Sequence, residues 1–349
     1  MNTYAATLFA PEDLRIVESD LGPLAPGMVR LRFGAGGICG SDLHYFRHAR
    51  TGDFVVSSPL VLGHEVAGDI VEINGSAPGL AVGDRVAVNP SRWCGHCSYC
   101  REGRPNLCEN IFFMGSASKT PHMQGGFASI FDATPAQCVK VPGTTPYAAA
   151  ALAEPLAVCL HAVMRAGDLR DRSVIVFGAG PIGLLTMLAA KLKGCSSATM
   201  VDIAAAPLAL ATQLGADRII NVGEGSEELA EAVRGRRFDV AFEVTGSPAG
   251  LASAIASVRR GGVLVQVGNL PGGQIQVPAN AIMAKELDFK GTFRFGREFD
   301  EAVGLITGGA VDVLQLVTAE FPLSSAEAAF RLASDRSRSV KVVLNRDLC

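Results

Sequence analysis

The sequence predicts an α/β protein in which a domain with a doubly wound parallel sheet is inserted into a β-rich domain. Short strand-like runs separated by Gly, Pro and Asp fill the first half of the chain, whereas strands and helices alternate beyond residue 150. After residue 286 the pattern becomes mixed again, so both ends of the chain are expected to build the first domain. We therefore expect a first domain over 1–153, an inserted domain over 154–286 and a return to the first domain over 287–349.

The inserted domain is predicted from the regular alternation of apolar runs and helical patterns. A helix opens it, because Leu156, Leu160 and Val163 recur at helical spacing and Pro155 suits a first turn. Runs such as "SVIVFG" and "FDVAFEVTG" are then each followed by a helical pattern. These helices are expected at 181–193, 205–214, 226–234 and 249–258.

The last part of the chain predicts two strands and two helices. "ELDFKGTFRF" and the closing "SVKVVL" look like strands, and Phe299, Ala302 and Val303 give a helical face. Ser324 and Glu327 have the spacing of a capping box for the helix in "AEAAFRLAS".

Composition limits the classes of function. The chain has 349 residues, 48% of them hydrophobic and 19% charged, with a net charge of −3 and no long basic run. These values suit a compact protein that binds neither nucleic acid nor an acidic membrane. The N-terminus lacks the pattern of a signal peptide, and the apolar runs look too short to span a bilayer, so we expect a cytoplasmic protein.

A glycine-rich motif, "GAGPIG", marks a candidate dinucleotide site. Gly178, Gly180 and Gly183 lie between a β-branched run and a helical pattern, which is the context of a Rossmann fingerprint rather than of an ordinary turn. Gly178 permits a tight turn, Gly180 lets the backbone approach a pyrophosphate, and Gly183 allows close packing of helix on strand. Pro181 and Ile182 complete the motif at the start of the helix, whose positive end attracts phosphate.

Asp202 ends the next predicted strand and favours NAD over NADP. Its carboxylate would accept hydrogen bonds from ribose hydroxyls and repel a 2′-phosphate. No Arg or Lys follows until Arg218, so no cation is at hand to bind that phosphate.

Four cysteines in "CGHCSYCREGRPNLC" predict a closed metal site. Nine cysteines in a chain expected in a reducing compartment favour metal binding over disulfides. Four thiolates around Zn²⁺ leave no position for substrate, so such a zinc is structural; a redox pair formed by the first two cysteines is the alternative. The lobe spans about 90–110, and its ligands are expected to be Cys94, Cys97, Cys100 and Cys108.

A second, dispersed set of donors predicts a catalytic metal site. Cys39 in "GGICGSDLHYF", His64 and Glu65 in "LGHEVAG", and Glu154 in "LAEPLAV" supply sulfur, nitrogen and oxygen atoms. A mixed site with three protein ligands and one open position is the catalytic type of zinc site. Taken singly, Cys39 could be a buried thiol and His64 an ordinary loop histidine, but the dinucleotide fingerprint makes the metal site the better interpretation.

These motifs, in this order and over essentially the whole chain, resemble the zinc-dependent medium-chain dehydrogenases. The resemblance implies a GroES-like, β-rich catalytic domain with an inserted Rossmann domain that binds NAD. Glu154 stands where the simple alcohol dehydrogenases carry a cysteine, which points to the polyol branch. The segment "FFMGSASKTPHMQGGF" departs from the sorbitol dehydrogenase pattern and points to an enzyme for a sugar acid.

The resemblance also implies roles for single residues in oxidation of a secondary alcohol. Ser41 and His44 would relay the proton, although His44 could be a plain surface histidine, and Glu154 would sit beside the zinc. Arg294 in "GTFRF" would bind the substrate carboxylate, with His122, Lys119 and Arg50 as alternatives. Phe113 and Ser116 are expected to contact the substrate, as is Tyr45, which could instead have a packing role. The nicotinamide is expected to contact Val267, Gly268, Asn269 and Phe293.

Two other functions stay open. The same chemistry could act on a neutral polyol such as sorbitol or xylitol, or the chain could be a non-catalytic NAD-binding sensor. An enzyme is expected to hold two zinc ions per chain, one catalytic and one structural, whereas a sensor would keep only the structural one. The family resemblance further implies a homotetramer, or a homodimer.

Overall fold

The computed structural model describes residues 2–223, 225, 227–235 and 238–347, and the chain forms two compact units. The first unit comprises Met1–Glu154 and Phe299–Cys349, and the second comprises Pro155–Glu298. The second boundary therefore lies later than the predicted 287. The reason is that β18 (Asp288–Gly291) pairs with β17 (Val258–Gln266) and so extends the sheet of the second unit.

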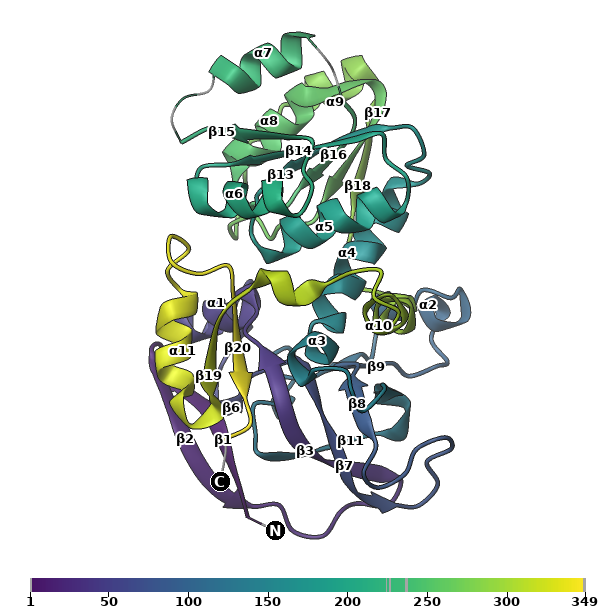
Figure 1. Ribbon diagram of the computed structural model, residues 1–349, viewed down its shortest axis with the longest axis vertical. Helices are drawn as coiled ribbons and strands as arrows, with labels where there is room; N and C mark the ends of the chain where they lie inside the picture. Colours follow the sequence, from purple (N-terminus) through teal and green to yellow (C-terminus); the bar gives the residue numbers. More distant parts are fainter. Residues whose placement is uncertain (1, 224, 226, 236–237, 348–349) are drawn as a thin grey trace. The chain divides into compact units, whose positions relative to one another are not determined.

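The first unit is built around a mixed sheet with the strand order β12–β8–β7–β3–β20–β19, in which β11 also pairs with β3 (Figure 1). β20, near the end of the chain, pairs antiparallel with β3, which explains why the C-terminal segment returns to this unit. The strands are β3 (Met28–Gly37), β7 (Glu65–Asn74), β8 (Arg85–Val88), β11 (Ile130–Ala133), β12 (Cys138–Lys140), β19 (Val317–Pro322) and β20 (Lys341–Asn345).

Smaller elements complete the first unit. A second sheet has the order β2–β1–β6, and β4–β5 and β10–β9 form short separate pairs. These strands are β1 (Asn2–Ala10), β2 (Asp13–Asp20), β4 (Arg50–Thr51), β5 (Phe54–Val55), β6 (Leu60–Val61), β9 (Ser91–Arg92) and β10 (Phe112–Phe113). The helices are α1 (Gly40–His48), α2 (Ser98–Arg101), α3 (Tyr147–Ala151), α10 (Glu298–Thr307) and α11 (Ala326–Ala333).

Aromatic side chains hold the sheets of the first unit together. Phe33, Phe127 and Phe330 are fully buried, and the rings of Phe127 and Phe330 meet edge to face with centroids 6.2 Å apart. Phe46 of α1 packs against Phe330 of α11 at 5.4 Å. Such pairs add to the burial of apolar area, so the helix before the C-terminal strand is anchored to the N-terminal half.

The predicted capping box of α11 is wrong. The residue before the helix is Ser325, whose side chain makes no cap hydrogen bond. The Ser324 hydroxyl instead donates to Asp347 Oδ1 at 2.8 Å. The Ser324 hydroxyl therefore binds Asp347, which is distant in the sequence, and does not cap the helix as the local pattern predicted.

The second unit is a parallel sheet with the order β15–β14–β13–β16–β17–β18, as predicted. Right-handed crossovers place α5 and α6 on one face and α8 and α9 on the other (Figure 1). β15 and β18 form the two edges of this sheet, and β17 lies inside it. The elements are α4 (Ala153–Ala166), β13 (Ser173–Phe177), α5 (Pro181–Leu192), β14 (Ser197–Asp202), α6 (Ala205–Gln213), β15 (Arg218–Asn221), α7 (Glu227–Gly235), β16 (Phe238–Glu243), α8 (Pro248–Ser257), β17, α9 (Ala279–Lys285) and β18.

The predicted helices of the second unit are confirmed to within about one or two residues at their ends. The predicted start of the third helix, residue 226, lies outside the described residues.

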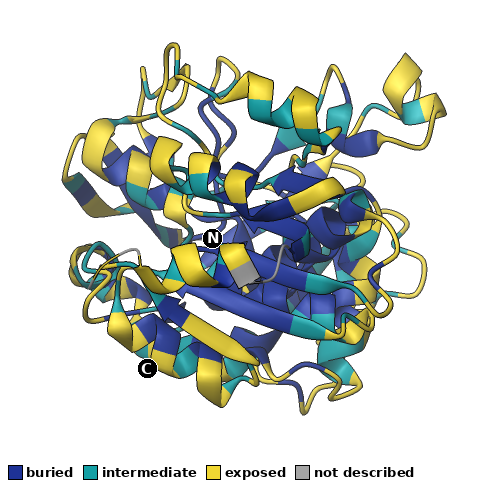
Figure 2. Cartoon of the chain, turned by 90° about the horizontal axis from the view of Figure 1, so that it is seen from above, coloured by how far each residue is buried: buried dark blue, intermediate teal, exposed yellow. Residues whose placement is uncertain are grey.

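Figure 2 shows buried residues concentrated on the strands and exposed residues on the outer faces of the helices. This pattern is expected for a sheet that is covered by helices on both faces.

Among the residues that the structure describes, one apolar stretch is long enough to cross a membrane, contrary to the expectation from sequence. Residues 147–166 form a helical run of 20 residues, and 83% of its most apolar window is buried in the fold. This burial is typical of the core helix of a globular protein.

Candidate active site

The three donors Cys39, His64 and Glu65 meet where β3 and β7 lie side by side. Cys39 stands just before α1, and His64 directly precedes Glu65, the first residue of β7. The register pairs Gly37 with Glu65, so the residues that follow β3 are brought to those that precede β7. One ligand atom from each of the three donors lies within 4.8 Å of the others, which is close enough to share one ion.

Asp42 fixes the orientation of this cluster. Its side chain is fully buried, lies 3.4 Å from His64 Nδ1, and accepts hydrogen bonds from Cys39 N at 3.0 Å and Gly63 N at 3.3 Å. Burial alone would lower the His64 pKa, but Asp42 and Cys39 outweigh it and raise that pKa well above its usual value. A carboxylate behind a ligating imidazole is the usual support of a metal site. Sequence reasoning missed Asp42, although it lies in the quoted motif "CGSD".

The Glu65 carboxylate is shared with a buried lysine. Lys341 Nζ donates to Glu65 Oε1 at 2.7 Å and to Ile38 O at 3.0 Å, and it lies 2.5 Å from Glu65 Oε2. Burial opposes the charge on Lys341, yet Glu65 and Cys39 raise its pKa, so the ammonium stays charged. A Cβ on Gly37 would lie 2.1 Å from Glu65 Oε2, which explains the glycine there. The signal for Lys341 was its single charge inside the apolar run "SVKVVL".

Glu154, at the start of α4, lies beside this cluster. Glu154 is 4% exposed, and burial raises its pKa to about 7. The Glu65 carboxylate raises this pKa further, whereas His64 and Lys341 lower it. Glu154 is not a member of the group of three donors that lie within 4.8 Å of one another. Its carboxyl group is therefore placed to act next to a metal held by the other three.

The two residues expected to relay a proton lie on α1. Ser41 Oγ is 3.5 Å from His64 Nε2, next to the metal cluster. His44 is exposed, and its ring centre lies 6.1 Å from that of His48. Partial shielding from water, followed by electrostatic effects of His48 and Arg336, lowers the His44 pKa. A neutral His44 can accept a proton.

Of the three expected substrate contacts, Phe113 lies against the cluster, and Tyr45 and Ser116 make hydrogen bonds within the neighbouring loop. The buried Phe113 ring packs 5.3 Å from the His64 ring. The Tyr45 hydroxyl accepts a hydrogen bond from Ala117 N at 3.1 Å, so Tyr45 supports the loop next to Ser116. Ser116 is buried and donates from its hydroxyl to Ser118 Oγ at 3.0 Å.

The four alternatives for a carboxylate-binding cation differ sharply. His122 is buried, its Nε2 accepts from Ser57 N at 2.9 Å and its Nδ1 lies 2.9 Å from Lys119 O, so both ring nitrogens are used within the fold. Arg50 folds back to Gly52 O, and Lys119 is exposed. In the second unit, Arg294 has a left-handed backbone (φ 52°), a conformation that is costly for a non-glycine residue, and its guanidinium lies 4.8 Å from the Phe293 ring.

The four cysteines of the lobe also converge. Their sulfur atoms all lie within 4.8 Å of one another, and the Cys94 and Cys100 sulfur atoms are 4.0 Å apart, too far for a disulfide. Backbone N–H groups point at the sulfurs: Cys97 N lies 3.4 Å from Cys94 Sγ and Cys94 N lies 3.3 Å from Cys108 Sγ. N–H groups of His96 and Cys97 lower the Cys94 pKa to about 6. This donor set fits a tetrahedral zinc.

The glycine motif of the second unit has the expected geometry. Gly178 has φ 104°, and a Cβ on Gly183 would lie 1.8 Å from Gly178 O, so both positions require glycine. A Cβ on Gly180 would meet no protein atom within 4 Å, which leaves room for a phosphate at the start of α5. Asp202 accepts from Ala179 N at 2.6 Å and from Ala204 N at 2.9 Å.

Glu243, which sequence reasoning did not single out, organises the segment expected to meet the nicotinamide. Its backbone oxygen accepts from Val267 N and Gly268 N at 2.8 and 2.9 Å. Gln266 Nε2 donates to both Glu243 Oε2 and Gly268 O at 2.6 and 2.7 Å. The backbone at Val267 and Gly268 is thereby held by the Glu243 backbone oxygen, and the buried Glu243 carboxylate supports it through Gln266.

Comparisons with known proteins agree with this architecture. Residues 25–143 match the family described as alcohol dehydrogenase GroES-like domain, and residues 181–308 match the family described as zinc-binding dehydrogenase. The chain is 40% identical to L-idonate 5-dehydrogenase (NAD(P)(+)) of Escherichia coli over 88% of this chain and 89% of that protein. It is 37% identical to sorbitol dehydrogenase of Bacillus subtilis, over 95% and 94% of the two chains. The crystal structure of the Escherichia coli L-idonate 5-dehydrogenase superposes with a TM-score of 0.93 at 36% identity, covering 99% of this chain and 98% of that one.

Proposed function

The chain belongs to the zinc-dependent medium-chain dehydrogenases, and from this premise we propose that it is an L-idonate 5-dehydrogenase. Its family makes it an oxidoreductase that uses zinc and NAD(P) on a polyol or sugar acid. The proposed reaction oxidises the C5 secondary alcohol of L-idonate to 5-dehydro-D-gluconate, with loss of one hydride and one proton. The observation that carries the dehydrogenase chemistry is the convergence of Cys39, His64 and Glu65 beside Glu154.

The residues divide the work of the reaction. Cys39 and His64 would hold the ion, and Glu65, held by Lys341, would serve as ligand or close support. Bound zinc supplies a Lewis acid that lowers the pKa of the substrate hydroxyl, and oxidised NAD(P) supplies the hydride acceptor. Ser41 would take the hydroxyl proton and His44 would carry it toward solvent.

The acid substrate requires a cation. Arg294 is our candidate because a guanidinium binds a carboxylate with two hydrogen bonds, and because its backbone is held in a costly conformation. The similarity to L-idonate 5-dehydrogenase supports the acid, and NAD is proposed over NADP because Asp202 ends β14 and no cation follows it closely.

Steady-state rates on L-idonate, sorbitol and xylitol test the proposal, with NAD and NADP compared. The Arg294→Ala variant should lose about tenfold or more in kcat/KM on L-idonate but little on sorbitol, because only the acid has a charged partner to lose. Arg297→Ala, at an exposed position of the same segment, is the matched control. Faster turnover of sorbitol, with idonate unaffected by the substitution, would instead favour a neutral polyol dehydrogenase.

The alternative of a neutral polyol dehydrogenase has its own support, since sorbitol dehydrogenases of several organisms are 35–38% identical to this chain.

The alternative of a non-catalytic sensor is tested by measuring the zinc content of the protein. We expect two zinc ions per chain, and one after Cys97→Ser, while Cys195→Ser keeps both. One zinc in the unaltered protein would support the sensor.

A further inference from the structure

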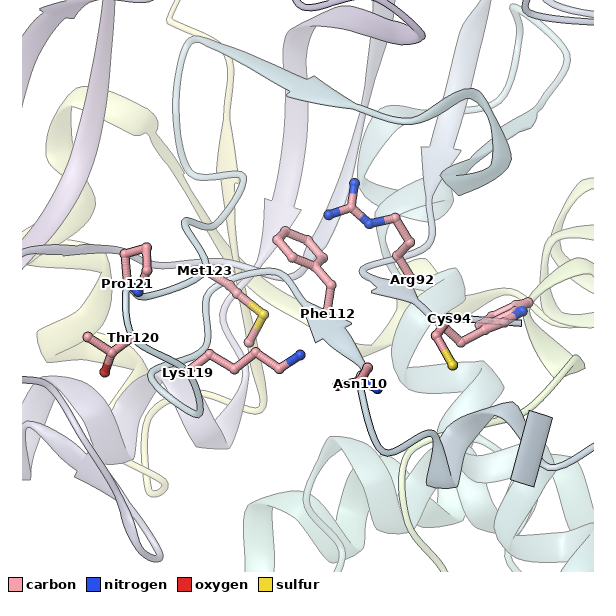
Figure 3. Close-up of a pocket in the computed structure, with 9 residues that line it drawn as sticks. Arg92, Cys94, Asn110, Phe112, Lys119, Thr120, Pro121 and Met123 are labelled. Carbon is pink, nitrogen blue, oxygen red and sulfur yellow. The ribbon is translucent and has the colours of Figure 1, made fainter. Parts of the chain in front are cut away.

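A pocket of about 360 Å³ lies in the first unit, beside the four-cysteine lobe. β9, β10 and the segment 119–123 contribute its walls, and Figure 3 shows the labelled side chains around it. Six of the residues that line it are exposed, so solvent reaches it. The lining residues are Arg92, Trp93, Cys94, Asn110, Phe112, Lys119, Thr120, Pro121 and Met123.

The lining carries two cations and no carboxylate. In Figure 3, Lys119 extends toward Phe112 and Asn110, and Arg92 reaches toward Phe112 from β9. The Arg92 guanidinium lies 4.5 Å from the centre of the Phe112 ring. Within the described part of the chain, neither cation lies within ion-pair distance of an acidic side chain. The positive charge of the pocket is therefore not cancelled by a carboxylate at its walls.

The pocket and the metal cluster share a wall. β10 is a two-residue strand: Phe112 lines the pocket, whereas the buried Phe113 packs against His64. Met123 also lines the pocket, and its sulfur accepts a hydrogen bond from Phe113 N at 3.2 Å. One strand thus separates the pocket from the metal cluster, but the residues that line the pocket include none of the catalytic donors.

We propose that this pocket is a second site, for a small hydroxylated organic anion such as a sugar acid or a sugar phosphate. The Arg92 fork and the Lys119 ammonium match a carboxylate or phosphate group. Asn110 and Thr120 offer hydrogen-bonding groups to hydroxyls, and Trp93 and Phe112 offer apolar faces, which is the mixture typical of small-molecule sites. The assignment does not depend on which alcohol the metal cluster oxidises.

Trp93 makes the proposal directly measurable, because it is the only tryptophan of the chain. The zinc-loaded protein without NAD would be titrated with gluconate, glucose 6-phosphate, inorganic phosphate and sorbitol while tryptophan fluorescence is recorded. We expect a saturable change with one or both sugar anions and none with sorbitol. Comparison of gluconate with glucose 6-phosphate shows whether the site prefers a carboxylate or a phosphate group. If inorganic phosphate binds as strongly as the two sugar anions, the site does not recognise the sugar, and the proposal is overturned.

Variants separate this site from the catalytic one. Lys119→Gln and Arg92→Gln should each weaken anion binding about tenfold, because each removes a charge-assisted hydrogen bond. Arg104→Gln, an exposed cation of the same lobe that does not line the pocket, should leave binding unchanged. Cys39→Ala should also leave the fluorescence response in place, whereas loss of the response there would show that it arises at the catalytic metal and would overturn the proposal.

The two cations have one competing role. Four thiolates around Zn²⁺ carry excess negative charge, and Cys94 lines the pocket, so Arg92 and Lys119 could serve only to balance the cluster. In that case the two glutamine variants would lose zinc faster to a chelator, and no sugar anion would change the fluorescence of the unaltered protein. That pair of results would overturn the proposal, while dehydrogenase activity would remain and leave the proposed function intact.

Discussion

Lys341 Nζ donates to Glu65 Oε1 across 2.7 Å, and the two side chains are only 3% and 1% exposed. The residues are 276 positions apart in the sequence, yet β20 and β7 both pair with β3 and so bring them together. Removing one partner of such a buried ion pair is costly, because the remaining charge stays buried without a partner.

Lys341→Met should therefore destabilise the protein by about 3–5 kcal/mol. Urea denaturation, with zinc content measured in parallel, checks this value. Lys140→Met is the control, because Lys140 pairs with Asp84 at 2.7 Å but is 55% exposed, and loss of an exposed pair costs at most about 1 kcal/mol. Equal effects of the two substitutions would contradict the role given to Lys341.

Asp42→Asn should weaken binding of the catalytic zinc about 10- to 100-fold, because an amide supports His64 less well than a carboxylate does. Competition with a chromogenic chelator measures the affinity, and the structural zinc serves as an internal reference. The exposed Asp53→Asn is the matched control. An unchanged affinity in Asp42→Asn would show that Asp42 only stabilises the first turn of α1.

Motifs along the chain predicted most of the fold and of the site, whereas the contact between Glu65 and Lys341, which the sequence alone does not reveal, was missed. The four-cysteine lobe and the glycine motif are local, so spacing alone placed Cys94 or Gly183 correctly. Lys341 could not be assigned to Glu65, because that contact depends on the strand order of the sheet. The domain boundary failed for a similar reason: "ELDF" has strand character in either unit, and only its pairing with β17 assigns it to the second.

Metal-free protein should lose stability as the pH rises from about 4.3 toward about 7, because Glu154 keeps its proton in the folded state over this range. Burial raises the Glu154 pKa to about 7, whereas an unfolded chain has a glutamate pKa of about 4.3. The folded state thus binds the extra proton, so its stability is fullest below about pH 4.3 and is lost as the pH passes through about 7. The melting temperature of chelator-treated protein should fall between about pH 5 and about pH 7 and level off above that, and Glu154→Gln should reduce this fall. Parallel curves for the two proteins would contradict the buried, titrating carboxyl group.

Cofactor preference should depend on the charge of Asp202. The carboxylate accepts from Ala179 N and Ala204 N, so it holds the glycine motif as well as facing the expected ribose. Asp202→Asn keeps an oxygen acceptor but removes the charge that repels a 2′-phosphate, and it should lower the ratio of kcat/KM for NAD to that for NADP about tenfold. Ile203 is 74% exposed, and Ile203→Arg added to Asp202→Asn should lower the ratio further by supplying a cation. Initial rates with both cofactors measure the ratio; if it stays constant in both variants, the preference is set elsewhere in the second unit.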